Sequence, residues 1–382
     1  MKNNYPTPYY IVFEDRLRRN LDLIKYVKES AGIEIIMAFK ANALWRTFSV
    51  FREYGVKSTA SSLNEMQLAN DELQVKAHSY CPVYTDATID KFLAGSSHIT
   101  FNSLKQFNRY KERVAQHNAA NPNEMVSCSV RINPMCSVVE TDIYNPSSPG
   151  SRFGVVADDI KELPEGLEGF HFHALCESTS YDLEKVLEAV EMQFGKFLPK
   201  LKWLNMGGGH LMTREGYDVE HLITLLKNFR AKYPNLQIIL EPGSAFTWRT
   251  GDLISSVMDV VTNHGIKTAI LDVSFACHMP DCLEMPYQPI ISEALKEVDM
   301  TKPTYRMGGN SCLSGDFVGD WSFDEELKEG DVLTFEDMNH YTTVKTHMFN
   351  GIQHPAMLYK HNDGTIEVLR EFTYEDYKNR MS

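Results

Sequence analysis

The sequence predicts an α/β protein, with a (β/α)8 barrel followed by an antiparallel β domain. Eight short apolar runs alternate with amphipathic stretches up to residue 241, as strands and helices do in a barrel. After about residue 250, β-rich runs punctuated by Gly and Asp replace the helical patterns. The 382 residues, 43% of them hydrophobic, suffice for one large domain and a smaller one. We therefore expect the barrel over residues 14–250 and the β domain over residues 251–382. The N-terminal strand, residues 1–13, is expected to join the β domain.

The eight apolar runs have the length and composition of buried parallel strands. They are IEIIMAF (33–39), VKSTA (56–60), KAHSYC (76–81), HITFN (98–102), VSCSVRI (126–132), GFHFHAL (169–175), KWLNM (202–206) and QIILE (237–241). Helical spacing is clearest in YDLEKVLEAVEMQFGKFL (181–198), and Ser62 to Glu65 has the pattern of a capping box that starts a helix. The predicted strands of the second domain include KTAILDVSF (267–275), TYRMGG (304–309), VLTFED (332–337) and YTTVKTHMF (341–349).

The composition narrows the class of partner. The formal net charge of −13 argues against nucleic acid, which binds basic surfaces. It is compatible with a small cationic substrate, although many globular proteins are as acidic. No apolar stretch of about 18 residues predicts a membrane span, and the N-terminus MKNNYPTPYY lacks the apolar segment of a signal peptide. The seven scattered cysteines form no CxxC pair, so we expect no metal site and a reducing cytoplasm.

Lys40 ends the first predicted strand, at the edge of the barrel where reactive groups lie. A lysine at the end of a strand commonly keeps its amine in water. In the mouth of a barrel, however, partial loss of solvation lowers the pKa of the amine and makes it nucleophilic. Such a lysine can hold an aldehyde cofactor as a Schiff base, and pyridoxal 5'-phosphate is a cofactor of that kind.

Two further groups at the same edge match other parts of that cofactor. Gly207, Gly208 and Gly209 follow the seventh strand, where barrels commonly bind phosphate, although three glycines also suit a plain tight turn. Glu241 ends the eighth strand and could keep the pyridine nitrogen protonated, which makes the ring a strong electron acceptor and favours decarboxylation. The alternative for Glu241 is a structural carboxylate beside a turn.

His171 and His173 alternate along the sixth predicted strand, so that both imidazoles face one side and one of them can stack on the cofactor ring. Core histidines held by hydrogen bonds give the same pattern. In the β domain, Cys312 and Asp316 lie in GGNSCLSGD, a Gly- and Ser-rich turn that would expose the thiol. A lone cysteine among small residues is otherwise often buried packing.

Taken together, these residues resemble the fold-type III pyridoxal-phosphate decarboxylases, the group of ornithine and diaminopimelate decarboxylases, whose barrel is of the alanine-racemase type. The resemblance covers nearly the whole chain. It implies Lys40 in AFKAN as the cofactor lysine, His173 in HFHAL as the residue that stacks on the ring, and Gly207–Gly209 as the phosphate loop. It also implies that Glu241 in EPG binds the pyridine nitrogen and that Tyr341 in NHYTTVKTHMFNG touches the phosphate.

The same resemblance implies a homodimer with shared active sites, in which Cys312 and Asp316 reach the neighbouring subunit. Departures from the ornithine and diaminopimelate pattern narrow the substrate, because Ser244 stands where an arginine usually follows EPG and Leu313 stands where ornithine decarboxylases have an aspartate. HFHALCE, NMGGGH, AILDVSFACHMPD and SCLSGD are instead similar to the carboxynorspermidine and carboxyspermidine decarboxylases of polyamine biosynthesis.

The reaction implied is decarboxylation of carboxynorspermidine or carboxyspermidine, with Lys40 and Cys312 as catalytic residues and Cys312 delivering the proton to Cα. Asp272, His278 and Asp316 are the expected substrate-binding residues, and Asp281 is either a further acidic candidate or a solvated loop residue. The alternatives are a decarboxylase of diaminopimelate, ornithine, arginine or lysine, a non-catalytic pyridoxal-phosphate-binding protein, and a barrel without cofactor. One methylene separates the two triamines and is worth only ~1–3 kcal/mol, so the sequence leaves both open.

Overall fold

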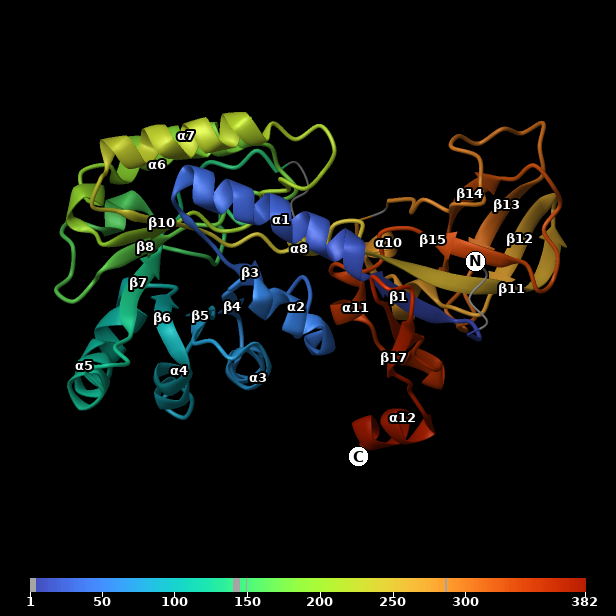
Figure 1. Ribbon diagram of the computed structural model, residues 1–382, viewed down its shortest axis with the longest axis horizontal. Coiled ribbons are helices and arrows are strands. Elements are labelled where there is room, and N and C mark those ends of the chain that lie inside the picture. The colour runs from blue at the N-terminus through green and yellow to red at the C-terminus, as the bar shows by residue number, and fades with distance from the viewer. Residues whose placement is uncertain (1–4, 140–144, 149, 286) are drawn as a thin grey trace. The chain divides into compact units, whose positions relative to one another are not determined.

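The structure is a computed structural model that describes residues 5–139, 145–148, 150–285 and 287–382 (Figure 1). The chain divides into two units. The barrel unit comprises residues 20–246. The β unit comprises residues 247–382 together with the N-terminal segment up to Arg19.

The barrel unit is built on a nine-stranded sheet whose paired strands are parallel. The predicted barrel fold is confirmed, because the strands fall on the eight predicted runs. They are β2 (Glu34–Ile35), β3 (Met37–Ala38), β4 (Ser58–Ala60), β5 (Ala77–Tyr80), β6 (Ser96–Phe101), β7 (Ser127–Arg131), β8 (Gly169–His171), β9 (Trp203–Asn205) and β10 (Gln237–Leu240). The first run is divided at Ile36. Since β2 pairs with β10 and β3 pairs with β4, this division brings the two ends of the sheet together and nearly closes it.

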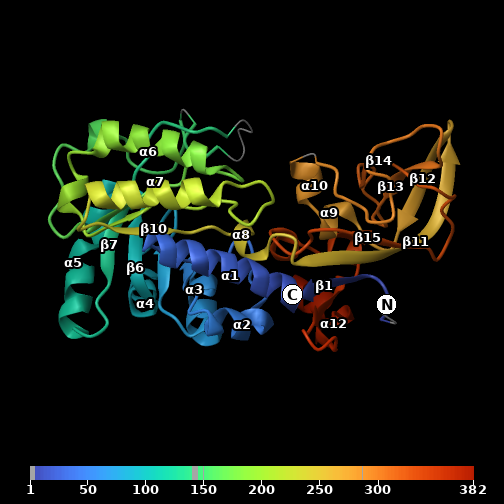
Figure 2. The same ribbon diagram turned by 45° about the horizontal axis from the view of Figure 1, so that its top comes forward.

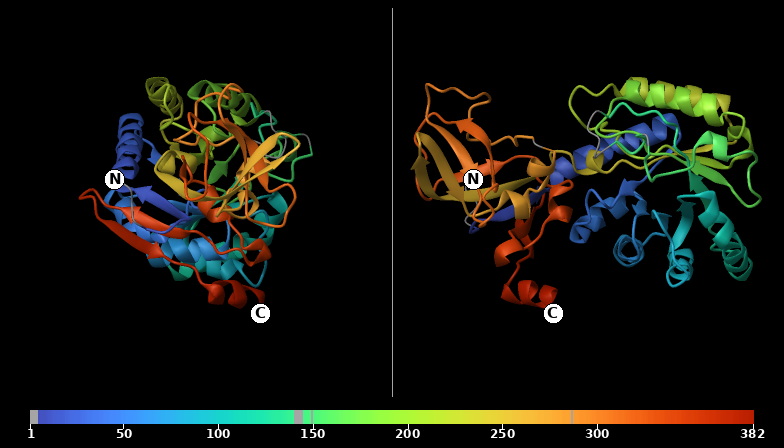
Figure 3. Two further views of the ribbon diagram at one scale, coloured as in Figure 1. Left: turned by 90° about the vertical axis from the view of Figure 1, so that its right-hand side faces the viewer. Right: turned by 180° about the vertical axis from the view of Figure 1, so that it is seen from behind.

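Helices connect the strands of the barrel unit and lie on the outer side of its sheet, as seen from two opposite directions in Figures 1 and 3. Figure 2 shows α6 and α7 running side by side. The helices are α1 (Glu14–Ala31), whose first residues belong to the β unit, α2 (Phe48–Glu53), α3 (Leu63–Leu68), α4 (Ile89–Gly95), α5 (Leu104–Ala120), α6 (Ser180–Phe194), α7 (Val219–Lys232) and α8 (Ser244–Thr247). Within the described residues, we find no helix with the length and apolar character that a membrane crossing requires.

Side-chain caps begin these helices as their sequences predict. Ser62 Oγ accepts from the backbone N–H of Glu65 over 3.2 Å at the start of α3. At the start of α6, Thr179 and Asp182 form a reciprocal capping box. The predicted helix over residues 181–198 ends earlier, at Phe194, because the chain turns there and enters a separate 3-10 turn that contains Pro199.

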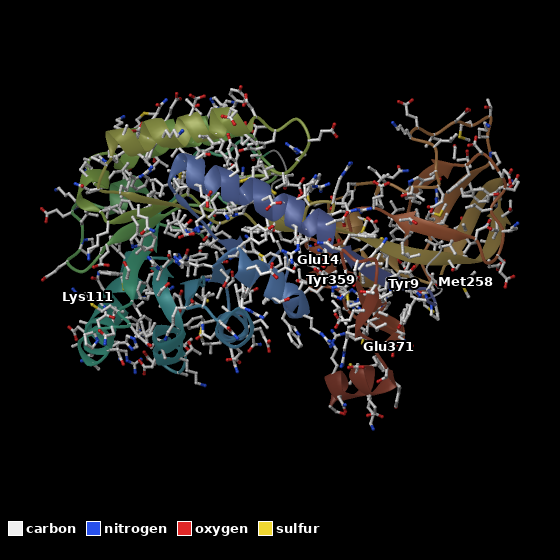
Figure 4. All side chains as sticks on the ribbon, in the orientation of Figure 1. Tyr9, Glu14, Lys111, Met258, Tyr359 and Glu371 are labelled. Atoms are coloured by element: carbon white, nitrogen blue, oxygen red, sulfur yellow. The ribbon has the colours of Figure 1, made fainter. Side chains whose placement is uncertain are left out.

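The β unit contains an eight-stranded sheet in the order β14-β13-β12-β11-β1-β16-β17, with β15 also paired to β11. Most pairs are antiparallel, but β1 with β16 and β12 with β13 are parallel, so the sheet is mixed. Figure 4 labels Tyr9 on β1, Met258 on β11 and Tyr359 on β16. The strands are β1 (Tyr9–Phe13), β11 (Gly251–Asn263), β12 (Ile266–Leu271), β13 (Thr304–Gly308), β14 (Phe317–Ser322), β15 (Val332–Phe335), β16 (Ala356–Lys360) and β17 (Ile366–Arg370).

Two expected strands of this unit are wrong in whole or in part. The run 341–349 forms the short helix α11 (Thr342–Lys345) and the 3-10 turn η6 (Phe349–Gly351), because its threonines bond to nearby backbone, as Thr343 Oγ1 does to the carbonyl of Asn339. The run 267–275 leaves the sheet after Leu271, since Ser274 Oγ caps a new helical turn, α9 (Phe275–His278). The other helices here are α10 (Asp281–Glu284) and α12 (Tyr374–Met381).

Candidate active site

Lys40 lies two residues after the end of β3, at the end of the barrel where the parallel strands terminate. Its neighbours Phe39 and Ala41 are completely buried, and the Phe39 ring stacks on Phe48 with centroids 5.1 Å apart. The backbone beside it is also fixed, because the N–H of Ala38 donates to the carbonyl of Pro242. The Lys40 side chain itself is exposed. A tightly held backbone therefore presents a solvent-accessible amine.

The surroundings of Lys40 favour its neutral form. Protein atoms crowd around the amine even though water reaches it, and this loss of solvation lowers its pKa. The carboxylate of Glu241 acts in the opposite direction, whereas the guanidinium of Arg131 lowers the pKa further. Lys40, Arg131 and Glu241 therefore lie close enough for their charges to interact. A lysine whose pKa is lowered in this way is a better nucleophile than one in open water.

Glu241 follows β10, and a separate side chain holds each of its carboxylate oxygens. His171 Nε2 lies 2.8 Å from Oε1, and Asn205 Nδ2 donates to Oε2 over 2.9 Å. Burial by itself would raise the pKa of Glu241, but the interactions with His171, Asn205 and Lys40 outweigh it and lower the pKa. The carboxyl group is therefore ionised at neutral pH.

The three glycines form a turn that only glycine can fit. Gly207 and Gly209 have φ of +73° and +91°, and a Cβ on Gly207 would lie 2.3 Å from the carbonyl oxygen of Phe172. The N–H of Gly207 donates to Asn205 Oδ1 over 2.9 Å, and the N–H of Gly208 donates to His173 Nδ1 over 3.1 Å. Two of the three glycine amides thus already have protein acceptors. The glycines serve close packing first, and the N–H groups from Gly209 onward are the candidates for a phosphate.

His173 lies beyond β8, which ends at His171 rather than at residue 175 as expected. Because His173 Nδ1 accepts from the N–H of Gly208, the hydrogen of the neutral ring sits on Nε2. Burial and the positive charges of Lys40 and Arg131 hold the pKa of His173 well below its usual value. The imidazole is therefore neutral and in contact with the glycine loop.

Arg131 and Asn205 have clear contacts in this site, although we predicted no role for either of them. Arg131 is 4% exposed, and Nη2 donates to the carbonyl of His173 over 3.3 Å. Its guanidinium carbon lies 5.0 Å from the centre of the Tyr80 ring and 4.5 Å from that of Phe153. The signal was available, since each residue is a charged or amide side chain at the end of a largely buried strand.

The other expected site residues lie in the β unit, around the turn that carries Cys312. The Cys312 side chain is exposed, and its backbone N–H donates to Asn350 Oδ1 over 2.8 Å. Asp316 is buried. Its Oδ1 accepts from the N–H of Ala276 over 2.9 Å, and its Oδ2 accepts from Ser311 Oγ over 2.5 Å. Asp316 therefore fastens the cysteine turn to α9.

Asp272 precedes α9, and His278 is the last residue of that helix. Asp272 Oδ1 accepts from Ser255 Oγ over 2.7 Å and from the N–H of Ser256 over 3.0 Å. His278 is completely buried, and burial together with His354 and His347 lowers its pKa to about 3. His278 is therefore a neutral group in the interior. Asp281, the further acidic candidate, forms an ion pair with Lys345.

Tyr341 begins α11 in a strained backbone conformation. Its φ of +53° and ψ of −44° lie outside the regions that non-glycine residues normally occupy. The N–H of Lys345 donates to its carbonyl, which closes the first turn of the helix. Strain of this kind concentrates at functional sites.

Among the described residues, we find no cluster of three or more His, Cys, Asp or Glu side chains that could bind a metal ion.

Comparison with known proteins decides the family. Residues 83–339 match the family model described as pyridoxal-dependent decarboxylase, C-terminal sheet domain. This chain belongs to the pyridoxal-dependent decarboxylases. The decarboxylase is 45% identical to a carboxyaminopropylagmatine decarboxylase from Synechocystis, over 99% of this chain and 96% of the relative. It is 38% identical to a carboxynorspermidine/carboxyspermidine decarboxylase from Campylobacter jejuni, over 98% of each chain.

Solved structures of this family have the same fold. A crystal structure of carboxynorspermidine decarboxylase from Campylobacter jejuni, complexed with norspermidine, matches with a TM-score of 0.89 and 37% identity, over 98% of this chain and 100% of that chain. Diaminopimelate decarboxylase from Helicobacter pylori, complexed with L-lysine, matches with a TM-score of 0.81 and 18% identity, over 99% and 97% of the two chains. The second likeness supports the fold alone.

The barrel residues of this decarboxylase fit its cofactor, pyridoxal 5'-phosphate. An aldehyde needs an amine that is neutral part of the time, and the lowered pKa of Lys40 provides one. A protonated pyridine nitrogen needs an ionised carboxylate, and Glu241 provides it on a side chain that is 16% exposed. The neutral His173 suits contact with an aromatic ring.

Proposed function

We propose that this decarboxylase removes CO2 from carboxynorspermidine, carboxyspermidine or both, which yields norspermidine, spermidine or both. The likeness to the Campylobacter jejuni enzyme over 98% of both chains supports this choice of substrate. The observation that supports the chemistry is the ionised carboxylate of Glu241. Two donors hold it, and its charge interacts with the Lys40 amine. A carboxylate at the ring nitrogen favours loss of CO2 because it strengthens the ring as an electron acceptor.

In this proposal the barrel side chains bind the cofactor and control its ring. Lys40 Nζ is the amine that would hold the aldehyde group of the cofactor. Glu241 would accept the hydrogen of the ring nitrogen, and His173 would face the ring. In the glycine loop Gly207–Gly209, the N–H of Gly209 would bind the phosphate, and Tyr341 would be a further phosphate ligand. Pyridoxal phosphate supplies an electron-accepting ring that takes up the electron pair left behind when CO2 departs.

Cys312 is the proposed proton donor. Its exposed thiol lies on a turn that hydrogen bonds to Asp316 hold in place. The thiol can therefore reach a group outside its own unit. We propose a cytoplasmic homodimer in which Cys312 of the partner subunit protonates Cα of the product. The apolar side chains of Leu313, Phe317 and Phe349, which are 45%, 40% and 48% exposed, support the burial of this surface against a second copy.

The cationic tail of the substrate needs carboxylates, and Asp272 is the best placed of the candidates. Both of its described hydrogen bonds reach Oδ1, so Oδ2 is the atom that we assign to a tail ammonium. Asp316 and His278 are buried. We propose that Asp316 contributes mainly its negative charge and that His278 contributes the shape of the pocket wall.

A second candidate substrate is carboxyaminopropylagmatine. The 45% identity to the Synechocystis enzyme that carries this name favours it. This substrate has the same amino-acid end as the carboxytriamines but ends in a guanidinium, which binds carboxylates through two parallel hydrogen bonds. The chemistry at Lys40 and Glu241 is common to both, so the choice rests on the tail pocket.

A comparison of kcat/KM across substrates tests both candidates. We expect one or both carboxytriamines to exceed ornithine, lysine, arginine and diaminopimelate by more than about 100-fold, because these amino acids leave the tail carboxylates unpaired. A clear preference for any of the four simple amino acids would contradict the proposal. A preference for carboxyaminopropylagmatine over both triamines would replace the proposed substrate with the second candidate.

A further inference from the structure

Two buried residues, His171 and Asn205, hold the carboxylate of Glu241. His171 on β8 is 2% exposed and Asn205 on β9 is 3% exposed, whereas the Glu241 side chain is 16% exposed. His171 Nε2 and Asn205 Nδ2 each approach a different oxygen, at 2.8 and 2.9 Å. Two donors on neighbouring strands thus fix the plane of the carboxylate and leave an open side.

The state of His171 follows from its surroundings. Its Nδ1 is buried and has no hydrogen-bond partner in the part of the chain that the structure describes. Nε2 is therefore the ring nitrogen whose hydrogen has an acceptor, and His171 donates from it to Glu241. The ring lies 5.3 Å from that of Tyr80, which limits its rotation. A buried nitrogen without a partner destabilises the fold, so packing alone does not account for a histidine here.

Asn205 links two parts of the site. Its Nδ2 donates to Glu241, while its Oδ1 accepts from the N–H of Gly207 over 2.9 Å. The backbone closes the same loop, since the N–H of Glu241 donates to the carbonyl of Gly207 over 2.9 Å. Three hydrogen bonds therefore link Glu241, Asn205 and the start of the glycine loop to one another.

We propose that His171 and Asn205 are positioning residues that fix the Glu241 carboxylate for its contact with the ring nitrogen of the cofactor, and that Asn205 keeps this contact in register with the glycine loop. This inference rests on the role proposed for Glu241. His171 acts through Glu241, and Asn205 acts through both Glu241 and Gly207.

Variants of His171 test the proposal. His171→Leu removes the donor, whereas His171→Gln places an amide nitrogen near the position of Nε2. We expect His171→Leu to lower kcat about 10- to 100-fold with KM changed less than about threefold, because loss of a hydrogen bond to a charged group costs about this much. The visible absorption of the bound cofactor should also change its pH dependence. His171→Gln should recover most of both effects.

The matched control is His78→Leu, another buried barrel histidine with an unpartnered Nδ1, which stacks on His98 and does not contact Glu241. It should keep the wild-type absorption and kcat. Melting temperatures of the variants report folding. If His171→Leu does not fold, Asn205→Ala is measured in its place. For Asn205→Ala we also expect a larger dissociation constant for the cofactor.

The inference is overturned if folded His171→Leu keeps the wild-type absorption and kcat, or if His171→Gln fails as badly as His171→Leu at an unchanged melting temperature. Absorption and cofactor binding need no substrate, so they remain informative if the proposed substrate is wrong. Glu241→Gln serves as the reference. If that change leaves the absorption unaltered, the proposed role of Glu241 fails, and the inference about His171 fails with it.

Discussion

The backbone N–H of Gly208 donates to Nδ1 of His173 over 3.1 Å. This bond ties the imidazole to the glycine loop and sets its hydrogen on Nε2. We expect His173→Ala to weaken cofactor binding about 2- to 10-fold, the value of one aromatic contact, and His173→Phe to keep most of the affinity. Fluorescence titration of the apoprotein with pyridoxal phosphate measures both. Equal losses in the two variants would show that the ring does not contribute by stacking.

The lowered pKa of Glu241 predicts a specific dependence of stability on pH. Its pKa in the folded protein lies below the ordinary value of 4.5. The unfolded chain therefore binds more protons between the two values, and stability rises with pH across that window. The stabilisation is fully present above pH 4.5 and is lost as the pH falls through the folded pKa.

Melting temperatures of the wild type and of Glu241→Gln between pH 3 and pH 7 check this sign. The difference between the two proteins should be constant above pH 4.5 and should shift against the wild type at lower pH. A difference that does not vary with pH would show that Glu241 titrates alike in the folded and unfolded chain.

Gly207→Ala tests the packing of the glycine loop, and Gly216→Ala is its matched control. Both positions have positive φ, +73° and +79°, so each alanine costs ~1–2 kcal/mol in backbone strain. At Gly216 a Cβ meets nothing within 4 Å, whereas at Gly207 it would lie 2.3 Å from the carbonyl oxygen of Phe172. We expect Gly207→Ala to lose ~1–3 kcal/mol more free energy of unfolding than Gly216→Ala.

Urea unfolding of the two glycine variants gives the comparison directly. If they lose the same free energy, the glycine loop has room for a side chain, and the close approach of Gly207 to the carbonyl of Phe172, just after β8, is not a constraint on the sequence.

The proposed homodimer predicts complementation between inactive chains. Lys40→Ala removes the cofactor lysine and Cys312→Ala removes the proton donor, so each variant alone should be at least ~100-fold less active. In a 1:1 mixture that exchanges subunits, half of the dimers are mixed and each has one intact site, so about a quarter of the wild-type activity should return. The activity of such mixtures, measured at increasing total protein concentration, shows how much activity returns. No recovery, with mixed dimers shown to form, would place Lys40 and Cys312 of one chain in one site.

The barrel was predictable because its strands are short apolar runs that end in polar residues, and the structure places strands on all eight runs. Lys40 and Glu241 could be found the same way, since a charged residue at the end of a buried strand of a barrel must lie on the rim. What the runs did not reveal was the division of the first strand at Ile36, because the pairing partners of β2 and β3 lie about 200 and 20 residues away.

The β unit was harder to predict for a physical reason. Its longest strand, β11 (Gly251–Asn263), is buried at one end and exposed at the other, and both halves mix apolar with polar residues, so it lacks an even pattern. The run that begins at Tyr341 has β-branched residues but is helical, because local hydrogen bonds replace sheet pairing. The roles of His171 and Asn205 depend on contacts between neighbouring strands, which spacing along one strand does not encode.

Covalent trapping at Lys40 tests the central claim most directly. Borohydride reduction of the holoenzyme, followed by digestion and mass spectrometry, should leave the pyridoxyl group on the peptide that contains Lys40, and Lys40→Ala should show no such label. A label on another lysine, or an unmodified Lys40 in fully reduced and inactivated enzyme, would contradict the account.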